Sequence, residues 1–270
     1  MEFASAPEVL AHRIVWAAVL LVPGVVLLGE GAALRALRQR DVAWLFVSAC
    51  LLAFNWLIFV WALFNGRMVE ASLGYYINPL MTVCLGVLFL GERPRPGQWA
   101  AVLIAGAGIA NEVVGLGLVP WAGLSLAVTF ALYGLVRRKV GVPSFVGLTV
   151  ETSLMFPFAC AFMFWQWLGA PEVSRTGGEL GLLALGGLVT IFPLLCFAHA
   201  ALRVPFTVLG FVQYLAPSIT LALAVLVYHQ AVQPERWVTF ALIWLAIAVF
   251  SAEGGYHGWR LNRRHRHAAG

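Results

Sequence analysis

The stretch YINPLMTVCLGVLFLGERPRPGQW at residues 76–99 returns 138 residues later, in diverged form, as YLAPSITLALAVLVYHQAVQPERW at residues 214–237. This offset superimposes Tyr76 on Tyr214, Pro79 on Pro217, Pro96 on Pro234, and Trp99 on Trp237. Both copies are almost continuously apolar up to the short polar loop that precedes Pro96 in one copy and Pro234 in the other. The chain is therefore a duplication of apolar segments, a pattern typical of membrane carriers whose two repeats enclose a central site.

The composition excludes a soluble globular domain. Hydrophobic residues make up 61% of the chain, charged residues 11%, and the mean hydropathy is +0.88, whereas soluble domains carry about 25% charged residues. A membrane-spanning helix needs about 20 predominantly apolar residues. Nine such segments are predicted, at 8–28, 42–64, 69–90, 98–114, 120–137, 145–168, 180–200, 205–228 and 236–253. We therefore expect an all-α, polytopic membrane helix bundle.

The repeat predicts how these spans are organised. We expect a single membrane domain (1–253) made of one half with four spans (1–114) and one with five (120–253), followed by a basic tail (254–270). The span at 120–137 pairs with positions before Met1. We therefore expect a ten-helix inverted-repeat fold that lacks its first helix here, through a late start codon or a truncated gene.

The positive charges predict the orientation, because Lys and Arg collect in the short loops on the cytoplasmic side. With a cytoplasmic C-terminus, that side receives 13 of the 17 basic residues, among them Arg137, Arg138 and Lys139. The basic tail (254–270) is interpreted as a cytoplasmic anchor. No aromatic side chains interleave its arginines as nucleic-acid stacking would require, so we expect no nucleic-acid partner.

Two prolines mark the first candidate site. Pro79 and Pro217 lie near the middle of equivalent spans, where a proline removes a backbone hydrogen bond and kinks the helix. In transporters, paired interruptions of this kind point to the substrate site, although packing geometry is the alternative explanation. Polar side chains lie beside both prolines: Tyr75, Tyr76 and Asn78 in one half, Gln213 and Tyr214 in the other.

Charged residues inside membrane spans are costly and by default functional. Arg13 lies in the first span and Glu70 opens the third span from the same predicted outer side, so these two residues can pair. Glu151, the repeat equivalent of Arg13, enters its span from the inner side, where no basic partner is evident. We expect either a structural ion pair or a role in substrate binding or proton coupling.

Four further polar or aromatic residues are candidates for the same site. His12 and His199 could relay protons, because an imidazole group in general has a pKa close to physiological pH, although a lone membrane histidine more often hydrogen-bonds a neighbouring helix. Asn55 and Trp56 project from the second span. Trp56 is expected to line a cavity or to lie at the membrane interface.

No cofactor or metal is expected. The four cysteines, Cys50, Cys84, Cys160 and Cys196, lie inside predicted spans without the spacing of metal ligands, and we interpret them as small buried apolar residues. The small residues Ala101, Ala105, Gly106 and Gly108 predict a close contact between helices.

Four motifs resemble a known family. The stretches EVLAHRIVW (8–16), VEASLGYYINPL (69–80), GVLFLGE (86–92) and LGFVQYLAP (209–217) are similar to RarD-type members of the EamA group, in the drug/metabolite transporter superfamily. The resemblance runs over the chain up to Glu253. It implies ten helices in two inverted halves, a bacterial inner-membrane location, and export or exchange of small organic molecules. It also implies functional roles for the matched residues His12, Arg13, Glu70, Tyr76, Asn78, Pro79, Gln213, Tyr214 and Pro217.

We expect a secondary carrier that works by alternating access, with a small-molecule substrate, a lipid surround and possible coupling to protons. No GxxxxGK[ST] loop of an ATPase is present in the sequence. One alternative is an intramembrane enzyme that modifies lipids or prenyl groups, but the sequence has neither HExxH nor paired aspartates. A non-transporting membrane assembly protein is the other alternative, and it gives no reason for the matched prolines.

Overall fold

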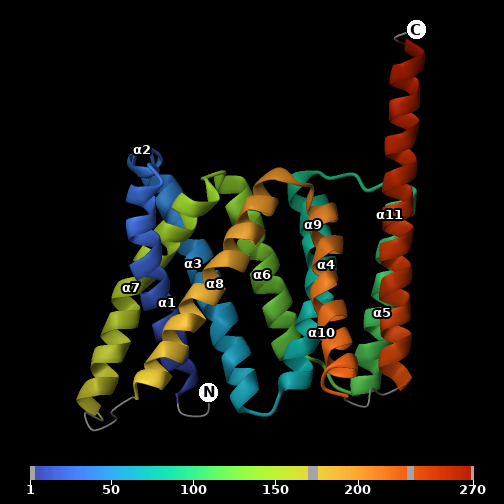
Figure 1. The fold of residues 1–270 in the computed structure, drawn as a ribbon. Helices are drawn as coiled ribbons and strands as arrows, with labels where there is room; N and C mark the ends of the chain where they lie inside the picture. Colours follow the sequence, from blue (N-terminus) through green and yellow to red (C-terminus); the bar gives the residue numbers. More distant parts are fainter. Residues whose placement is uncertain (1–3, 170–175, 230–233, 269–270) are drawn as a thin grey trace. The chain divides into compact units, whose positions relative to one another are not determined.

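A computed structural model describes residues 4–169, 176–229 and 234–268 (Figure 1). Eleven helices and no strand occur in these residues, which confirms the all-α prediction. The helices are α1 (Ala6–Leu27), α2 (Gly31–Arg35), α3 (Gln39–Phe64), α4 (Met68–Leu90), α5 (Pro96–Leu116), α6 (Trp121–Val140), α7 (Ser144–Gly169), α8 (Gly177–Arg203), α9 (Phe206–Gln213), α10 (Leu215–Leu226) and α11 (Pro234–Ala268).

All nine predicted spans lie in helices, and the eighth of them is divided between α9 and α10. Among the described residues, eight helical segments are long and apolar enough to cross a membrane. The remaining predicted span is α6, a 20-residue helix that carries Arg137, Arg138 and Lys139 in its last turn. These three charges fall within the helix rather than after it, so the apolar part of α6 is shorter than that of the other spans.

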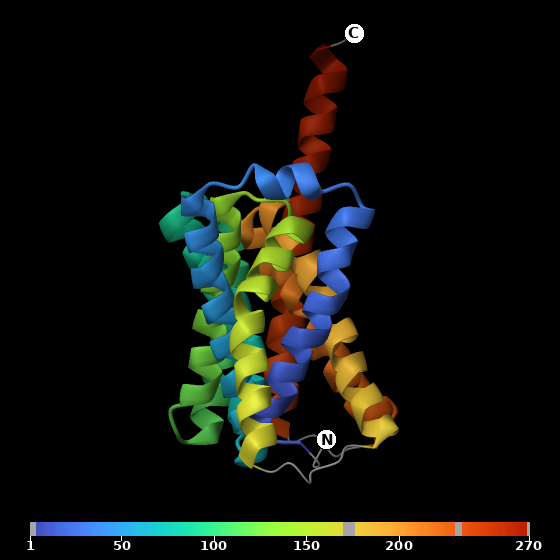
Figure 2. The ribbon, with the colours of Figure 1, turned by 90° about the vertical axis from the view of Figure 1, so that its left-hand side faces the viewer.

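The chain forms two compact units, and each unit combines helices from both repeat halves. Unit 1 comprises residues 1–68 and 128–204, and unit 2 comprises residues 69–127 and 205–270. In unit 1, α1 packs against α7 and α8, and α3 packs against α7. The short helix α2 connects the ends of α1 and α3 (Figure 2).

Unit 1 has a core of apolar side chains from α1, α3, α6, α7 and α8, namely Ala17, Leu21, Leu52, Tyr133, Leu148 and Leu194. The α1 and α8 helices approach each other closely at Gly187. A Cβ atom at that position would lie 2.6 Å from Cβ of Trp16. Small residues allow membrane helices to gain packing energy through such close approaches.

Unit 2 is dominated by the contact between α5 and α11, which are repeat equivalents. Ala101 and Ala105 are completely buried in one core cluster with Ile243 and Ala246. A Cβ atom at Gly108 would lie 3.2 Å from Cβ of Leu242. The predicted small-residue contact is therefore confirmed for Ala101, Ala105 and Gly108, and its partner is α11, whereas Gly106 faces Leu80 of α4.

Large apolar side chains cover much of the surface of the helices, as expected where lipid rather than water surrounds them. Leu27 is 85% exposed and Val114 is 79% exposed. The prediction that the cysteines are buried is wrong for Cys50, Cys84 and Cys196, which are exposed. A thiol is compatible with the lipid-facing surface as well as with the core, so the apolar pattern of these helices could not distinguish the two.

Candidate functional site

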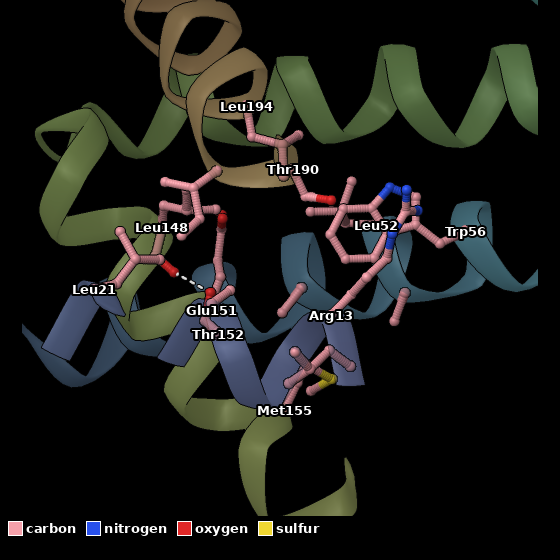
Figure 3. Close-up of a pocket in the computed structure, with 15 residues that line it drawn as sticks. Arg13, Leu21, Leu52, Trp56, Leu148, Glu151, Thr152, Met155, Thr190 and Leu194 are labelled. Carbon is pink, nitrogen blue, oxygen red and sulfur yellow. Dashed lines mark hydrogen bonds between the residues drawn. The ribbon is translucent and has the colours of Figure 1, made fainter. Parts of the chain in front are cut away.

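Unit 1 contains a pocket between α1, α3, α7 and α8 (Figure 3). Its cavity volume is about 30 Å³, and the surrounding empty space amounts to about 430 Å³ when the open mouth is included. Three of the predicted site residues, Arg13, Trp56 and Glu151, are among those that line it. The other lining residues are Ile14, Ala17, Leu21, Ala49, Leu52, Ala53, Leu148, Thr152, Met155, Thr190, Ile191 and Leu194.

The lining of this pocket follows the internal repeat. Twelve of the fifteen lining residues form six pairs that are 138 positions apart. The pairs are Arg13 with Glu151, Ile14 with Thr152, Ala17 with Met155, Leu52 with Thr190, Ala53 with Ile191, and Trp56 with Leu194. The two repeats thus contribute equivalent residues to one pocket, which is where inverted-repeat carriers place their binding sites.

Arg13 enters the pocket from α1 and lies over the indole of Trp56 on α3 (Figure 3). The guanidinium carbon is 5.6 Å from the ring centroid. An arginine over an indole face is attracted by the ring quadrupole, more strongly where water is excluded. Glu70, the predicted partner of Arg13, is buried in the first turn of α4 in unit 2. The pairing of Arg13 with Glu70 stays a prediction.

Glu151 is held by three side chains from other helices. Its carboxylate accepts a 2.5 Å hydrogen bond from the Ser48 hydroxyl on α3 and a 3.5 Å hydrogen bond from the Tyr133 hydroxyl on α6. Nη1 of Arg137, also on α6, lies 3.6 Å from Oε1 of Glu151. Both members of this ion pair are buried: the Arg137 side chain is 0% exposed and that of Glu151 is 2% exposed.

The expectation that Glu151 has no basic partner is therefore wrong. The sequence predicts Arg137 among the cytoplasmic loop charges, because it precedes Arg138 and Lys139 at the end of a span. Its side chain instead turns into unit 1 and packs on Gly147 of α7, where a Cβ atom would overlap the guanidinium. The glycine opposite the arginine was the only sequence signal for this arrangement, and it is a weak one.

Two other candidates on unit 1 lie near the pocket without lining it. His12 is buried on α1. The Asn55 side chain donates a 2.8 Å hydrogen bond from Nδ2 to the Thr129 hydroxyl, and thereby joins α3 to α6. In a membrane helix an amide with such a partner stabilises the bundle, so the structure favours a packing role for Asn55.

The candidates around the two prolines gather in unit 2. Nδ2 of Asn78 donates a hydrogen bond to Oε1 of Gln213, which joins α4 to α9. A Cβ atom at Gly210 would lie 2.6 Å from the Pro79 carbonyl oxygen, so these helices are in close contact. Tyr214 is completely buried, and the Tyr76 ring meets Phe240 edge-on with centroids 5.5 Å apart. Tyr75, in contrast, is 51% exposed.

The two prolines interrupt their helices differently. The helix of the second repeat breaks into α9 and α10 at Tyr214, three residues before Pro217. The break follows from the absence of an amide hydrogen on Pro217, which leaves the carbonyl of residue 213 without its intrahelical donor. Pro79 lies inside α4, which is continuous from Met68 to Leu90. A break in the helix is thus found in the second repeat only, and the predicted kink at Pro79 stays a prediction.

Comparisons with known proteins agree with this architecture. Residues 1–111 match the EamA-like transporter family. Protein RarD of Escherichia coli is 40% identical over 260 residues, which is 94% of this chain and 87% of the relative. An uncharacterized transporter of Vibrio cholerae is 43% identical over 258 residues, 93% of this chain and 84% of the relative. A solved crystal structure has a TM-score of 0.69 at 21% identity and covers 91% of this chain and 88% of its own, which shows a common fold.

Proposed function

We propose that this chain, which belongs to the RarD-type branch of the EamA-like transporter family, is a secondary carrier of small organic molecules that works by alternating access. It is a multi-pass membrane protein of the drug/metabolite transporter superfamily. The matching family is one of transporters, and relatives from Vibrio cholerae and Bacillus subtilis are named as uncharacterized transporters, which supports a non-enzymatic function. We further propose a place in the bacterial inner membrane with a cytoplasmic C-terminus.

The pocket of unit 1 is the observation that carries this proposal. Equivalent residues of the two repeats form most of its lining. A conformational change that opens the pocket to one side of the membrane therefore has an equivalent, in which the two repeats exchange conformations and the pocket opens to the other side. Inverted repeats provide alternating access by this exchange. We propose that Arg13, Trp56 and Glu151 contact the substrate.

The chemistry of the pocket limits the substrate class. Most lining side chains are apolar, and the polar groups are one guanidinium, one carboxylate, the indole N–H of Trp56 and the hydroxyls of Thr152 and Thr190. A ligand that fits this lining has an apolar body and one or two polar groups, as in other small-molecule sites. We expect the aromatic face of Trp56 to contact the apolar body.

Proton coupling is part of the proposal and depends on Glu151, a carboxyl group at the pocket wall that has a buried cation as its neighbour. Substrate or a proton could compete for this carboxylate. A Glu151→Gln variant keeps the side-chain shape and removes the titratable group. Transport by this variant with the same pH dependence as the wild-type protein would contradict the coupling role.

The experiment is uptake of a panel of labelled small organic compounds into liposomes under an imposed pH gradient, with the purified protein in the membrane. We expect accumulation of at least one compound, and a loss of about tenfold in uptake for Trp56→Ala, equivalent to about 1.4 kcal/mol. The matched control is Leu103→Ala, at a side chain that is 70% exposed. Equal losses in both variants would argue against the pocket, and turnover of a lipid without any uptake would favour an intramembrane enzyme.

A further inference from the structure

A second cavity of unit 1 lies where α6 ends, α7 begins and α8 ends. Its cavity volume is about 650 Å³. Unlike the first pocket, it is lined by several charged or titratable side chains, namely Arg138, His199, Arg203 and Glu30. It therefore differs in chemistry from the pocket proposed for the substrate.

Two guanidinium groups give this cavity its positive character. Nη1 of Arg138 donates hydrogen bonds to the carbonyl oxygens of Ala201, at 2.9 Å, and Val204, at 3.4 Å. These bonds fix Arg138 at the C-terminal end of α8. Arg203 lies on the last turn of the same helix and contacts the ring of His199. Glu30 is the one carboxylate in the lining, and its negative charge offsets part of the positive charge of the two arginines.

The N-terminus of α7 adds a third favourable group for an anion. The helix begins at Ser144 and runs for 26 residues, and both Ser144 and Phe145 line the cavity. The first amide groups of a helix have no intrahelical acceptors, and the helix dipole favours negative charge at this end.

An unpaired hydroxyl group points independently to a ligand. Ser144 is only 9% exposed. Its Oγ atom is buried and has no hydrogen-bond partner within the described part of the chain. Leaving a buried hydroxyl unpaired is unfavourable, so an acceptor atom in the cavity would relieve that cost. The backbone of the same residue is fixed, because its carbonyl accepts a 3.3 Å hydrogen bond from Arg137.

From these contacts we propose that the cavity binds a phosphate group, with Arg138 and Arg203 supplying charge and Ser144 a hydrogen bond. Arginine binds phosphate through charge-assisted hydrogen bonds. The predicted orientation puts this end of unit 1 on the cytoplasmic side, where anionic lipids and soluble phosphates are both available and where basic pockets between helices bind headgroups. Phe145, Leu195 and Leu202 supply an apolar wall beside the charges. The site does not depend on the proposed transport activity.

The test compares two phosphate sources on the intact protein. Binding of phosphatidylglycerol is measured by native mass spectrometry after release from mixed micelles, and binding of inorganic phosphate by calorimetry in phosphatidylcholine nanodiscs. We expect saturable binding of at least one probe. A lipid-only result identifies a headgroup as the source, whereas binding of both identifies the phosphate group itself as the recognised chemistry.

Charge variants connect the binding to this cavity. Arg203→Gln is expected to weaken binding about fivefold, the effect of one positive charge near a membrane surface, and Ser144→Ala to weaken it as well. Glu30→Gln removes the opposing carboxylate and is expected to tighten binding, a gain that a purely structural role does not produce. The matched control is Arg93→Gln, an exposed arginine of unit 2. Binding of neither probe, or equal losses in the Arg93 and Arg203 variants, would overturn the proposal.

Discussion

Replacing Glu151 by leucine leaves the guanidinium of Arg137 buried without its counter-ion. The Arg137 side chain is 0% exposed, and its Nε and Nη1 atoms have no hydrogen-bond partner in the described residues. The carboxylate 3.6 Å away is therefore the main electrostatic compensation for this cation. Removing one member of a buried ion pair costs about 3–5 kcal/mol because the remaining charge keeps its desolvation cost.

Substitution of the other partner, Arg137→Met, and the double variant allow the interaction energy of the ion pair to be separated from the effect of each side chain on its other neighbours. Arg137→Met alone is expected to destabilise by less than Glu151→Leu, because the Ser48 and Tyr133 hydroxyls still bind the carboxylate. The double variant removes both charges and fills similar volume with apolar atoms, a change that is often close to neutral for a buried pair. We therefore expect a coupling energy of about 3 kcal/mol in the double-mutant cycle.

The assay is SDS-driven unfolding from mild detergent micelles, followed by tryptophan fluorescence, for the wild-type protein, both single variants and the double variant. The pair of Arg95 and Glu253 in unit 2 serves as the control cycle. Its atoms are closer, at 2.9 Å, but the Arg95 side chain is 40% exposed, so its coupling should stay below about 1 kcal/mol. If the Glu151 and Arg137 effects simply add, or if the control pair couples as strongly, burial is not the source of the energy and the reasoning fails.

Two further substitutions test packing and capping. Gly147→Ala puts a methyl group into the Arg137 guanidinium and should cost about 1–3 kcal/mol by overpacking, whereas Gly31→Ala meets nothing within 4 Å and should leave the unfolding transition in the same assay unchanged. Glu92→Ala removes the carboxylate that accepts the backbone N–H groups of the first turn of α9. It should cost about 1–2 kcal/mol, as loss of a helix cap does, and an unchanged unfolding midpoint would show that these amide groups find other acceptors.

The sequence was sufficient for the helical class and for eight of the nine spans, because the apolar length of a segment is a local property. The 138-residue offset can be read directly from the sequence, and the lining of the pocket in unit 1 follows it. The sequence also brought Arg13, Trp56 and Glu151 onto the candidate list, and the structure places all three on one pocket. The reason is that a charged side chain inside an apolar span carries a high free-energy cost in the membrane, whichever way the side chain points. Residue type alone was informative at these positions.

Side-chain direction at a helix end could not be predicted in the same way. Arg137 and Arg138 are neighbours in one basic triplet, yet Arg137 turns into unit 1 and pairs with Glu151, while Arg138 binds backbone carbonyls at the end of α8. The difference depends on what α7 and α8 present at that level, above all on the missing side chain of Gly147. The grouping of helices from both halves into each unit has the same origin, because it is decided by packing between distant segments.

The opposite charges at positions 13 and 151 explain how a duplicated pocket can hold two ionisable groups. Identical residues at these equivalent positions would place like charges on the walls of one apolar pocket, where the low dielectric makes repulsion strong. An arginine in one repeat and a glutamate in the other remove that repulsion. The two charges are also held differently: the Arg13 guanidinium lies on an indole ring, whereas Glu151 is bound by Ser48, Tyr133 and Arg137. Exchange of the roles of the two repeats therefore changes the electrostatics of the pocket even where its shape is conserved, so we expect a polar substrate to be released to the two sides with unequal ease.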